Sequence, residues 1–210
     1  MTELSAIIKK IRNIMRKDPG ISGDAQRLEQ ITWLLFLKIY DAKEEEWELM
    51  DESYVSIIPE RFKWRNWAVD NKDGKALTGD ALLHYIDDEL FPTLNALEIT
   101  ADTSNRQAIV KAALKGIHNY MKNGTFLREA INTLDEIDFN KLEDRHAFGE
   151  IYELMLKELQ SQGKAGEFYT PRAVTDFIIK VIDPQLGERI ADFACGTGGF
   201  LTSSLNYIKS

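Results

Sequence analysis

Apolar residues recur every three or four positions through most of the first 160 residues, which is the spacing of one face of a helix. The first such stretch has its apolar positions at Leu4, Ile7, Ile8, Ile11, Ile14 and Met15. The run Asp18-Pro19-Gly20 predicts the end of this helix. A second helix is predicted with Asp24 as its cap, and from Ile31 to Tyr40 nearly every face of it is apolar. We therefore expect the second helix to be the buried centre of a bundle.

The chain between residues 44 and 92 mixes charged and aromatic residues. The run Glu44-Glu45-Glu46 predicts a solvated helix face. The run from Arg61 to Trp67 interleaves basic and aromatic residues, a pattern that contacts nucleic acid in some proteins. More often such a run packs its rings inward and leaves its charges in water. Thr78 or Asp80 opens a further helix, which Pro92 is expected to end.

Two more helices are predicted before residue 160. Ser104 and Gln107 are spaced as a capping box ahead of a helix that runs to Met121. The dipeptide Asn123-Gly124 is expected to stop that helix. The last helix of this part covers residues 148–159.

The pattern changes at the polar, glycine-containing stretch 161–166, which we interpret as a domain boundary. The dipeptide Thr170-Pro171 then predicts the start of a helix. The apolar face of this helix is formed by Val174, Phe177, Ile178 and Val181. A short strand is predicted over residues 189–193, followed by a glycine turn over 195–199 and another helix. This order is typical of the opening of an α/β nucleotide-binding sheet.

The expected fold is therefore mainly α, with a helical bundle over residues 1–160 and the start of an α/β domain over residues 161–210. The net charge is also distributed unevenly between these two parts of the chain. The net charge is -8, whereas residues 161–210 hold five basic and five acidic residues, so the helical part carries all of it. A stand-alone nucleic-acid-binding protein usually has a basic excess. The composition instead favours a protein partner with a basic or apolar face.

No segment predicts export or membrane insertion. The longest apolar stretch, Trp33 to Leu37, is far shorter than the roughly 18 residues of a spanning helix. The single cysteine, Cys195, excludes an internal disulfide, and we expect it to be a small packed residue rather than a nucleophile. His84, His118 and His146 have no partner at metal-ligand spacing. A cytoplasmic protein without a metal site is expected.

The run from Asp192 to Phe200 carries the strongest chemical signal. A strand that turns sharply into a helix needs glycines, which adopt positive φ and let a ligand approach the backbone closely. Here Gly196, Gly198 and Gly199 supply them. The backbone N–H groups of such a turn face a polar ligand group at the helix N-terminus. The spacing fits neither the dinucleotide fingerprint G-x-G-x-x-G nor the P-loop.

The run from Gly166 to Arg172 is a second candidate. Taken alone, it is most simply a helix start, with a polar loop, a threonine cap and a proline. As a binding site, it would place Phe168 or Tyr169 against a sulfonium cation. Thr170 and the nearby N–H groups would then hold a carboxylate.

Together, the runs Glu167–Arg172 and Asp192–Leu201 resemble the amino-methyltransferases of DNA. More narrowly, the chain resembles the modification (M) subunit of type I restriction-modification systems. The helical N-terminal domain of that family is similar in length and style to residues 1–160. The segments Leu35–Lys38 and Ile58–Trp64 also look like it.

The resemblance implies an α/β methyltransferase domain in which both motifs line a pocket for S-adenosyl-L-methionine. The residues carried over to this pocket are Glu167, Phe168, Tyr169, Thr170, Pro171, Arg172, Asp192, Gly196, Thr197, Gly198 and Gly199. Asp192 and Gly196 would shape the turn, and the others would contact the cofactor. Phe193 departs from the proline that the family often has at that position.

The resemblance also implies methyl transfer to adenine N6 in a specific DNA sequence. The implied partners are DNA, a specificity subunit, a restriction subunit and a second modification subunit. Cytosine-N4 chemistry uses the same motifs. Two alternatives stay open, a methyltransferase that acts on RNA or protein and a non-catalytic helical interaction module.

The family's catalytic motif, Asn/Asp-Pro-Pro-Tyr/Phe, is absent, because none of the five prolines is adjacent to another. In the family this motif accepts the target amino group and stacks the flipped-out base on its ring. The sequence therefore assigns no catalytic residue. We expect the N-terminal part of a longer polypeptide that is inactive by itself.

Overall fold

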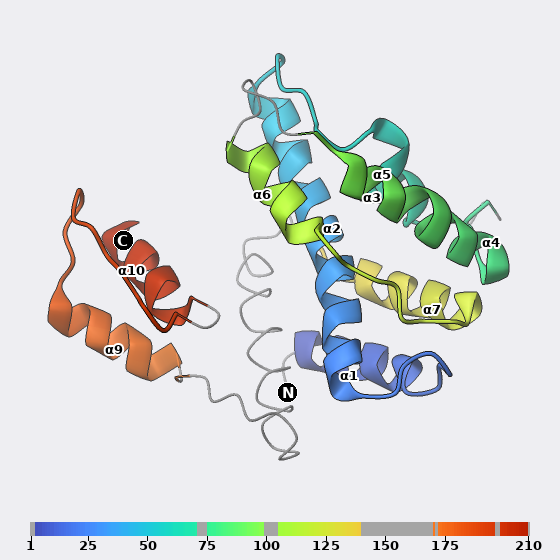
Figure 1. Cartoon of the computed structure of the whole chain (residues 1–210), viewed down its shortest axis with the longest axis horizontal. Helices are drawn as coiled ribbons and strands as arrows, with labels where there is room; N and C mark the ends of the chain where they lie inside the picture. The colour runs from blue at the N-terminus through green and yellow to red at the C-terminus, as the bar shows by residue number, and fades with distance from the viewer. Residues whose placement is uncertain are drawn as a thin grey trace. The chain divides into compact units, whose positions relative to one another are not determined.

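The structure is a computed structural model that describes residues 3–70, 75–98, 105–139, 170, 172–195 and 198–209 (Figure 1). Contacts divide the chain into two compact units, residues 1–155 and residues 156–210, and each is described by itself. Every regular element of the described residues is a helix, as the mainly α class requires. The domain boundary expected at residue 161 stays a prediction. None of the described helices is long and apolar enough to cross a membrane.

Helix α1 (Glu3–Met15) ends at the turn that the sequence predicts. Asp18 in this turn is buried, and its carboxylate accepts hydrogen bonds from three backbone N–H groups. The donors, at 2.8, 2.9 and 3.0 Å, are Gly20, Lys122 and Asn123. One carboxylate therefore accepts hydrogen bonds both from its own turn and from a segment about 100 residues further along the chain.

Helix α2 (Asp24–Met50) begins at the residue that was predicted to cap it, so its N-cap lies one residue earlier than predicted. Its N-cap is Gly23, and Asp24 lies inside the first turn. There the Asp24 carboxylate pairs with Arg12 at 3.3 Å and with Arg27 at 2.9 Å. The side chain is held by two guanidinium groups and by the positive end of the helix dipole, so it does not cap the helix.

The middle of α2 is the centre of the first unit, as the sequence predicts. Its side chains with at most 2% exposure include Ile31, Trp33, Leu34, Leu35 and Leu37. The helix continues well past Tyr40, and Glu44 in this extension is fully buried. The expectation of a solvated face at the acidic run is therefore wrong for Glu44.

The basic and aromatic run forms a 3-10 turn, η1 (Glu60–Phe62), and a short helix, α3 (Trp64–Trp67). The rings of Phe62, Trp64 and Trp67 are between 3% and 6% exposed. The inward packing of the rings is confirmed. The charges are left in water only in part: Arg61 is exposed, whereas Lys63 is buried.

Residues 79–96 form one continuous helical stretch with a wide turn inside it. Helix α4 (Gly79–His84) leads into a π-helical segment, η2 (Tyr85–Leu90), and then into α5 (Phe91–Ala96). The N–H of Phe91 bonds the carbonyl of Ile86 five residues back, and Pro92 follows. Proline has no N–H and clashes with the previous turn of a regular helix. Here it falls in the first turn of α5, where it is tolerated, so the prediction that Pro92 ends the helix is wrong.

The predicted stop at Asn123-Gly124 is in fact a start. Helix α6 (Asn105–Leu114) ends early, and Gly116 in the following turn has a φ of +74°. Asn123 is the N-cap of α7 (Gly124–Asp135), and its side chain accepts the N–H groups of Thr125 and Phe126. The proposed capping residue Ser104 lies outside the described residues.

Helix α7, which the sequence analysis missed, packs against both α1 and α4. A Cβ added at Gly124 would overlap the backbone carbonyl of Gly79, so the two helix starts meet at two glycines. Arg128 on α7 is buried, and its guanidinium donates to the carbonyls of Leu77 and Ala68 at 2.7 and 2.6 Å. Helix α7 thereby fixes the chain between α3 and α4.

In the second unit, α9 (Arg172–Ile182) packs against α10 (Gly199–Lys209) (Figure 1). The break after α9 is confirmed, and Asp183 there has a φ of +53°. The predicted strand over residues 189–193 is wrong: residues 189–192 have no regular secondary structure, and residue 193 lies in a turn. A strand exists through its ladder of hydrogen bonds to a neighbour, and the described residues hold no neighbouring strand.

Candidate functional site

The glycine turn is built around Gly198. Its N–H donates to the carbonyl of Cys195 at 2.7 Å, and its own carbonyl accepts the N–H and hydroxyl of Thr202 at 2.8 and 2.9 Å. The φ of Gly198 is +77°, a conformation that favours glycine. A Cβ there would meet no atom within 4 Å. The glycine is therefore required by its backbone conformation, and open space lies beside it.

Asp192 stands just before this turn with one oxygen unsatisfied. Its Oδ1 accepts the N–H of Ala194 at 3.1 Å. Its Oδ2 is buried and has no hydrogen-bond partner among the described residues. A buried carboxylate oxygen normally accepts a hydrogen bond, so Asp192 Oδ2 is suited to a donor group on a ligand.

The packing of α9 on α10 brings the start of α9 beside the glycine turn at the start of α10. Near the start of both helices, the hydroxyls of Thr175 and Ser203 lie 3.1 Å apart in a buried contact. A Cβ on Gly199 would lie 3.8 Å from the methyl group of Thr175. At the other end, the Tyr207 hydroxyl donates to Asp183 at 2.6 Å. The two helices are therefore parallel, with their N-termini side by side.

Parallel N-termini point backbone N–H groups and the positive ends of two helix dipoles in one direction, which suits an anionic group. Of the predicted site residues, the structure describes Thr170, Arg172, Asp192, Gly198 and Gly199. Thr170 is exposed at the start of α9. The rest lie outside the described residues: Glu167, Phe168, Tyr169, Pro171, Gly196 and Thr197.

Cys195 lies in the same turn and is exposed. The prediction that it is a small packed residue is therefore wrong. Its place is set by the turn, because its carbonyl accepts the Gly198 N–H.

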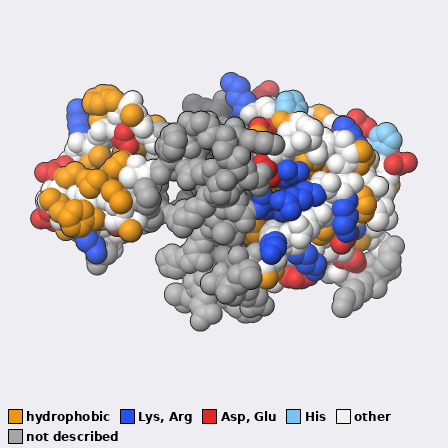
Figure 2. Space-filling view, turned by 90° about the horizontal axis from the view of Figure 1, so that it is seen from below, with side chains coloured by type: hydrophobic (Ala, Val, Ile, Leu, Met, Phe, Trp, Pro, Cys, Tyr) orange, Lys and Arg blue, Asp and Glu red, His pale blue; other side chains and the backbone are white. Residues whose placement is uncertain are grey.

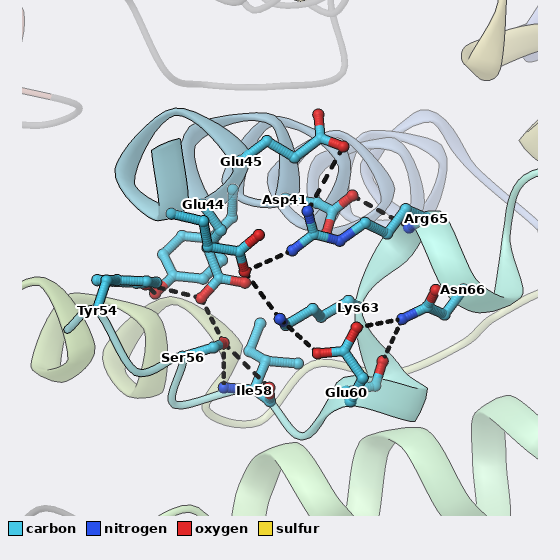
Figure 3. A network of polar contacts seen from close by, with 12 residues as sticks. Asp41, Glu44, Glu45, Tyr54, Ser56, Ile58, Glu60, Lys63, Arg65 and Asn66 are labelled. Atoms are coloured by element: carbon cyan, nitrogen blue, oxygen red, sulfur yellow. Dashed lines mark hydrogen bonds and ion pairs between the residues drawn. The ribbon is translucent and has the colours of Figure 1, made fainter. Parts of the chain in front are cut away.

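A second polar cluster, in the first unit, was not predicted (Figure 3). It joins the end of α2 to residues 54–66. Glu44, which is 0% exposed, accepts the Tyr54 hydroxyl at 2.8 Å and also the Ser56 hydroxyl. Burial, together with hydrogen bonds to Tyr40 and Glu44, raises the pKa of Tyr54 above its usual value.

The other half of this cluster is ionic. Glu48 accepts Lys63 at 2.9 Å and Arg65 at 2.7 Å. Burial by itself raises the pKa of Glu48, but these two cations hold it below the usual value. Burial raises the pKa of Asp41 to about 6, although Arg65 opposes the shift. Most charged groups of the cluster pair with one another, although Glu44 Oε2 is buried without a hydrogen-bond partner among the described residues. We interpret the cluster as holding the loop against α2.

Two family profiles match the chain. The one described as "HsdM N-terminal domain" matches residues 4–137, and the one described as "N-6 DNA Methylase" matches residues 143–210. The second match includes both motifs of the candidate site.

Individual proteins show the same similarity. The chain is 55% identical over 206 residues to the EcoEI type I restriction enzyme methylase subunit of Escherichia coli, covering 98% of the chain and 41% of that protein. It is 26% identical to the StySPI methylase subunit of Salmonella potsdam, covering 92% of the chain and 33% of that protein.

A solved modification subunit from Vibrio vulnificus, assigned to a type I restriction enzyme, superposes with a TM-score of 0.83 at 38% identity. The superposition covers 98% of the chain and 45% of that subunit. The chain thus spans less than half the length of the relatives that it matches. Its two units match the two family profiles in order along the sequence, and the chain belongs to the HsdM family of type I restriction-modification methylase subunits.

Proposed function

We propose that the chain is the N-terminal part of the DNA methyltransferase subunit of a type I restriction-modification complex. This subunit would methylate adenine N6 in a specific DNA sequence. The observation that carries the proposal is the glycine turn, in which Gly198 borders open space and Asp192 Oδ2 lacks a donor. Family membership favours DNA over RNA or protein as the substrate, because the family matched by residues 143–210 is that of N-6 DNA methylases. It also disfavours a purely structural interaction module.

The cofactor of this reaction would be S-adenosyl-L-methionine, which supplies an activated methyl group on a sulfonium sulfur. The unsatisfied oxygen of Asp192 and the open space beside Gly198 fit such a molecule, which carries hydroxyl and ammonium donors. Asp192 would accept one of these donors, while the start of α10 would direct N–H groups at an anionic or polar part. Residues 167–172 would complete the pocket, with aromatic rings suited to a cation.

Calorimetry with S-adenosyl-L-methionine tests the site. We expect the substitution Gly198→Asp to weaken binding at least tenfold, because it puts a side chain and a negative charge into the open space. Gly187→Asp is the matched control, since Gly187 has a φ of +93° and open space in the same unit. Equal binding by the two variants would remove the assigned role of the glycine turn.

The partners proposed for the complex are DNA, a specificity subunit, a restriction subunit and a second modification subunit. One solved relative, 33% identical with a TM-score of 0.79, comes from a study of complex assembly in a type I system. Because the 210 residues contain no Pro-Pro pair, we expect this chain alone to transfer no labelled methyl groups to DNA. Incorporation of label above background would contradict that expectation.

A further inference from the structure

The first unit is acidic overall, but helix α1 is not. Five of the nine residues from Lys9 to Lys17 are basic. One of them, Arg12, is buried and pairs with Asp24. The other four are exposed: Lys9, Lys10, Arg16 and Lys17.

These four basic residues lie on the side of α1, and of the turn at Arg16 and Lys17 that follows it, that faces away from the core. The buried positions Ile8, Ile11 and Met15 lie on the opposite side. Viewed from below, Lys and Arg side chains gather over α1 on this face of the first unit (Figure 2). We call the surface formed by Lys9, Lys10, Arg16 and Lys17 the α1 basic face.

Little in the described structure neutralises the α1 basic face. Lys10 pairs with Glu136 at 2.9 Å, but both side chains are about half exposed and such pairs are weak. No ion pair between described residues involves Lys9, Arg16 or Lys17. A hollow of about 420 Å³ is lined by Lys9, Lys10 and Lys17, and the acidic residue in its lining is Glu129.

The geometry points to a nucleic-acid backbone as the occupant, and we propose that the α1 basic face contacts the phosphates of duplex DNA. This proposal rests on the proposed function, which supplies DNA as the substrate. Counted at the helical rise per residue, the stretch from Lys9 on α1 to Lys17 in the following turn is about 12 Å long. Each strand of a duplex carries one phosphate per about 3.4 Å of the helix axis, so the face spans about three of them when it lies along that axis.

The composition of the α1 basic face favours DNA over a protein partner. Interfaces between proteins are depleted in lysine and are anchored by aromatic residues, methionine or arginine in a desolvated centre. The exposed side of α1 between residues 6 and 17 carries lysines, Arg16, Asn13 and Ala6, with no aromatic residue. Exposed lysines release counterions from DNA without needing a tight fit.

The test is the salt dependence of binding of the 210-residue chain to a 30-base-pair duplex, followed by fluorescence anisotropy. The variant is Lys9→Gln/Lys17→Gln. Its matched control is Lys111→Gln/Lys115→Gln on and after α6, which changes the net charge equally. Loss of two phosphate contacts would lower the slope of log K against log salt by about 1.8. We expect that change in the α1 variant and none in the control.

Equal slopes for the two variants, or no binding of the wild-type chain at low salt, would overturn the proposal. So would displacement of the duplex by poly-glutamate at the same charge concentration, which would indicate an acidic protein partner. Calorimetry of S-adenosyl-L-methionine on the same variants separates the two hypotheses. The α1 variant should bind it normally, whereas failure of the wild-type chain to bind it would count against the cofactor site alone.

Discussion

Both units of the chain are helical, but they differ in how far the apolar faces of their helices are buried. In the first unit Leu34 is 1% exposed, and the strongly exposed hydrophobic residues, Leu49, Met50 and Val55, lie at or after the end of α2. In the second unit α9 meets α10 through Thr175 and Ile179, while Phe177 and Val181 are 67% and 68% exposed. The predicted apolar face of α9 is therefore not the face that packs on α10.

Helix α10 behaves in the same way. It buries Ser203 and Ser204 and leaves Leu205 52% exposed. Hydrophobic side chains accordingly cover much of the second unit in Figure 2. The comparison teaches that periodicity indicates which face of a helix requires a neighbour, whereas only the tertiary structure shows which face has one. An exposed apolar surface of this kind is typical of an interaction site.

The largest effect should separate Leu34 from Phe177. We expect Leu34→Ala to lower the free energy of unfolding by about 2–5 kcal/mol, because it leaves a cavity in a packed core. Phe177→Ala should change it by less than about 0.5 kcal/mol, as for an exposed site. Urea unfolding followed by circular dichroism measures both. A similar loss in both variants would show that α9 is covered.

Asp41, a buried carboxylate of the first unit, should make the free energy of unfolding depend on pH, with an effect of intermediate size. The pKa of Asp41 is raised to about 6 from 3.8, so between these values the folded state binds more protons than the unfolded state. The free energy of unfolding should therefore fall as the pH rises from about 4 to 6, by at most about 3 kcal/mol.

Asp41→Asn removes this titration. The difference in stability between the wild type and the variant should change across that pH window and stay flat above it. Tryptophan fluorescence is a suitable probe, because all four tryptophans, Trp33, Trp47, Trp64 and Trp67, lie in the first unit. A constant difference from pH 4 to 8 would mean that Asp41 is not perturbed.

The smallest effects should distinguish two glycines that are required for different reasons. At Gly124 the space is closed, so Gly124→Ala should cost about 1–3 kcal/mol by overpacking. At Gly198 the space is open but φ is positive, so Gly198→Ala should cost about 1 kcal/mol.

Asparagine sharpens this difference, since it tolerates positive φ but is larger than alanine. Gly198→Asn should be milder than Gly198→Ala, and Gly124→Asn should be at least as harmful as Gly124→Ala. Thermal unfolding of the four variants gives both orders. The same order at the two sites would contradict the distinction.

The sequence predicts most of what depends on local pattern. The limits of α1, the buried middle of α2 and the break at Asp183 follow from periodicity and from turn residues. It misses α7, because Asn123-Gly124 suits the end of one helix as well as the start of the next. The contact of Gly124 with Gly79, 45 residues earlier, belongs to the start, and no local pattern contains it.

The polar clusters are missed for the same reason. Glu44 looks solvated beside Glu45 and Glu46, because its partners Tyr54 and Ser56 lie beyond a turn. The basic run in α1 is visible in the sequence, but a charge summed over the whole helical part hides it. At the candidate cofactor site, the need for glycine at residue 198 was predictable, whereas the unsatisfied oxygen of Asp192 required coordinates.

Asp18 has a consequence for how the first unit tolerates change. Its carboxylate closes a ring of chain that starts after α1 and returns just before α7. Lengthening a surface turn inside that ring adds little closure entropy, which grows only with the logarithm of length. Insertions between α2 and α6 should therefore survive in relatives, while an asparagine at residue 18, with only one acceptor oxygen, would loosen the whole ring.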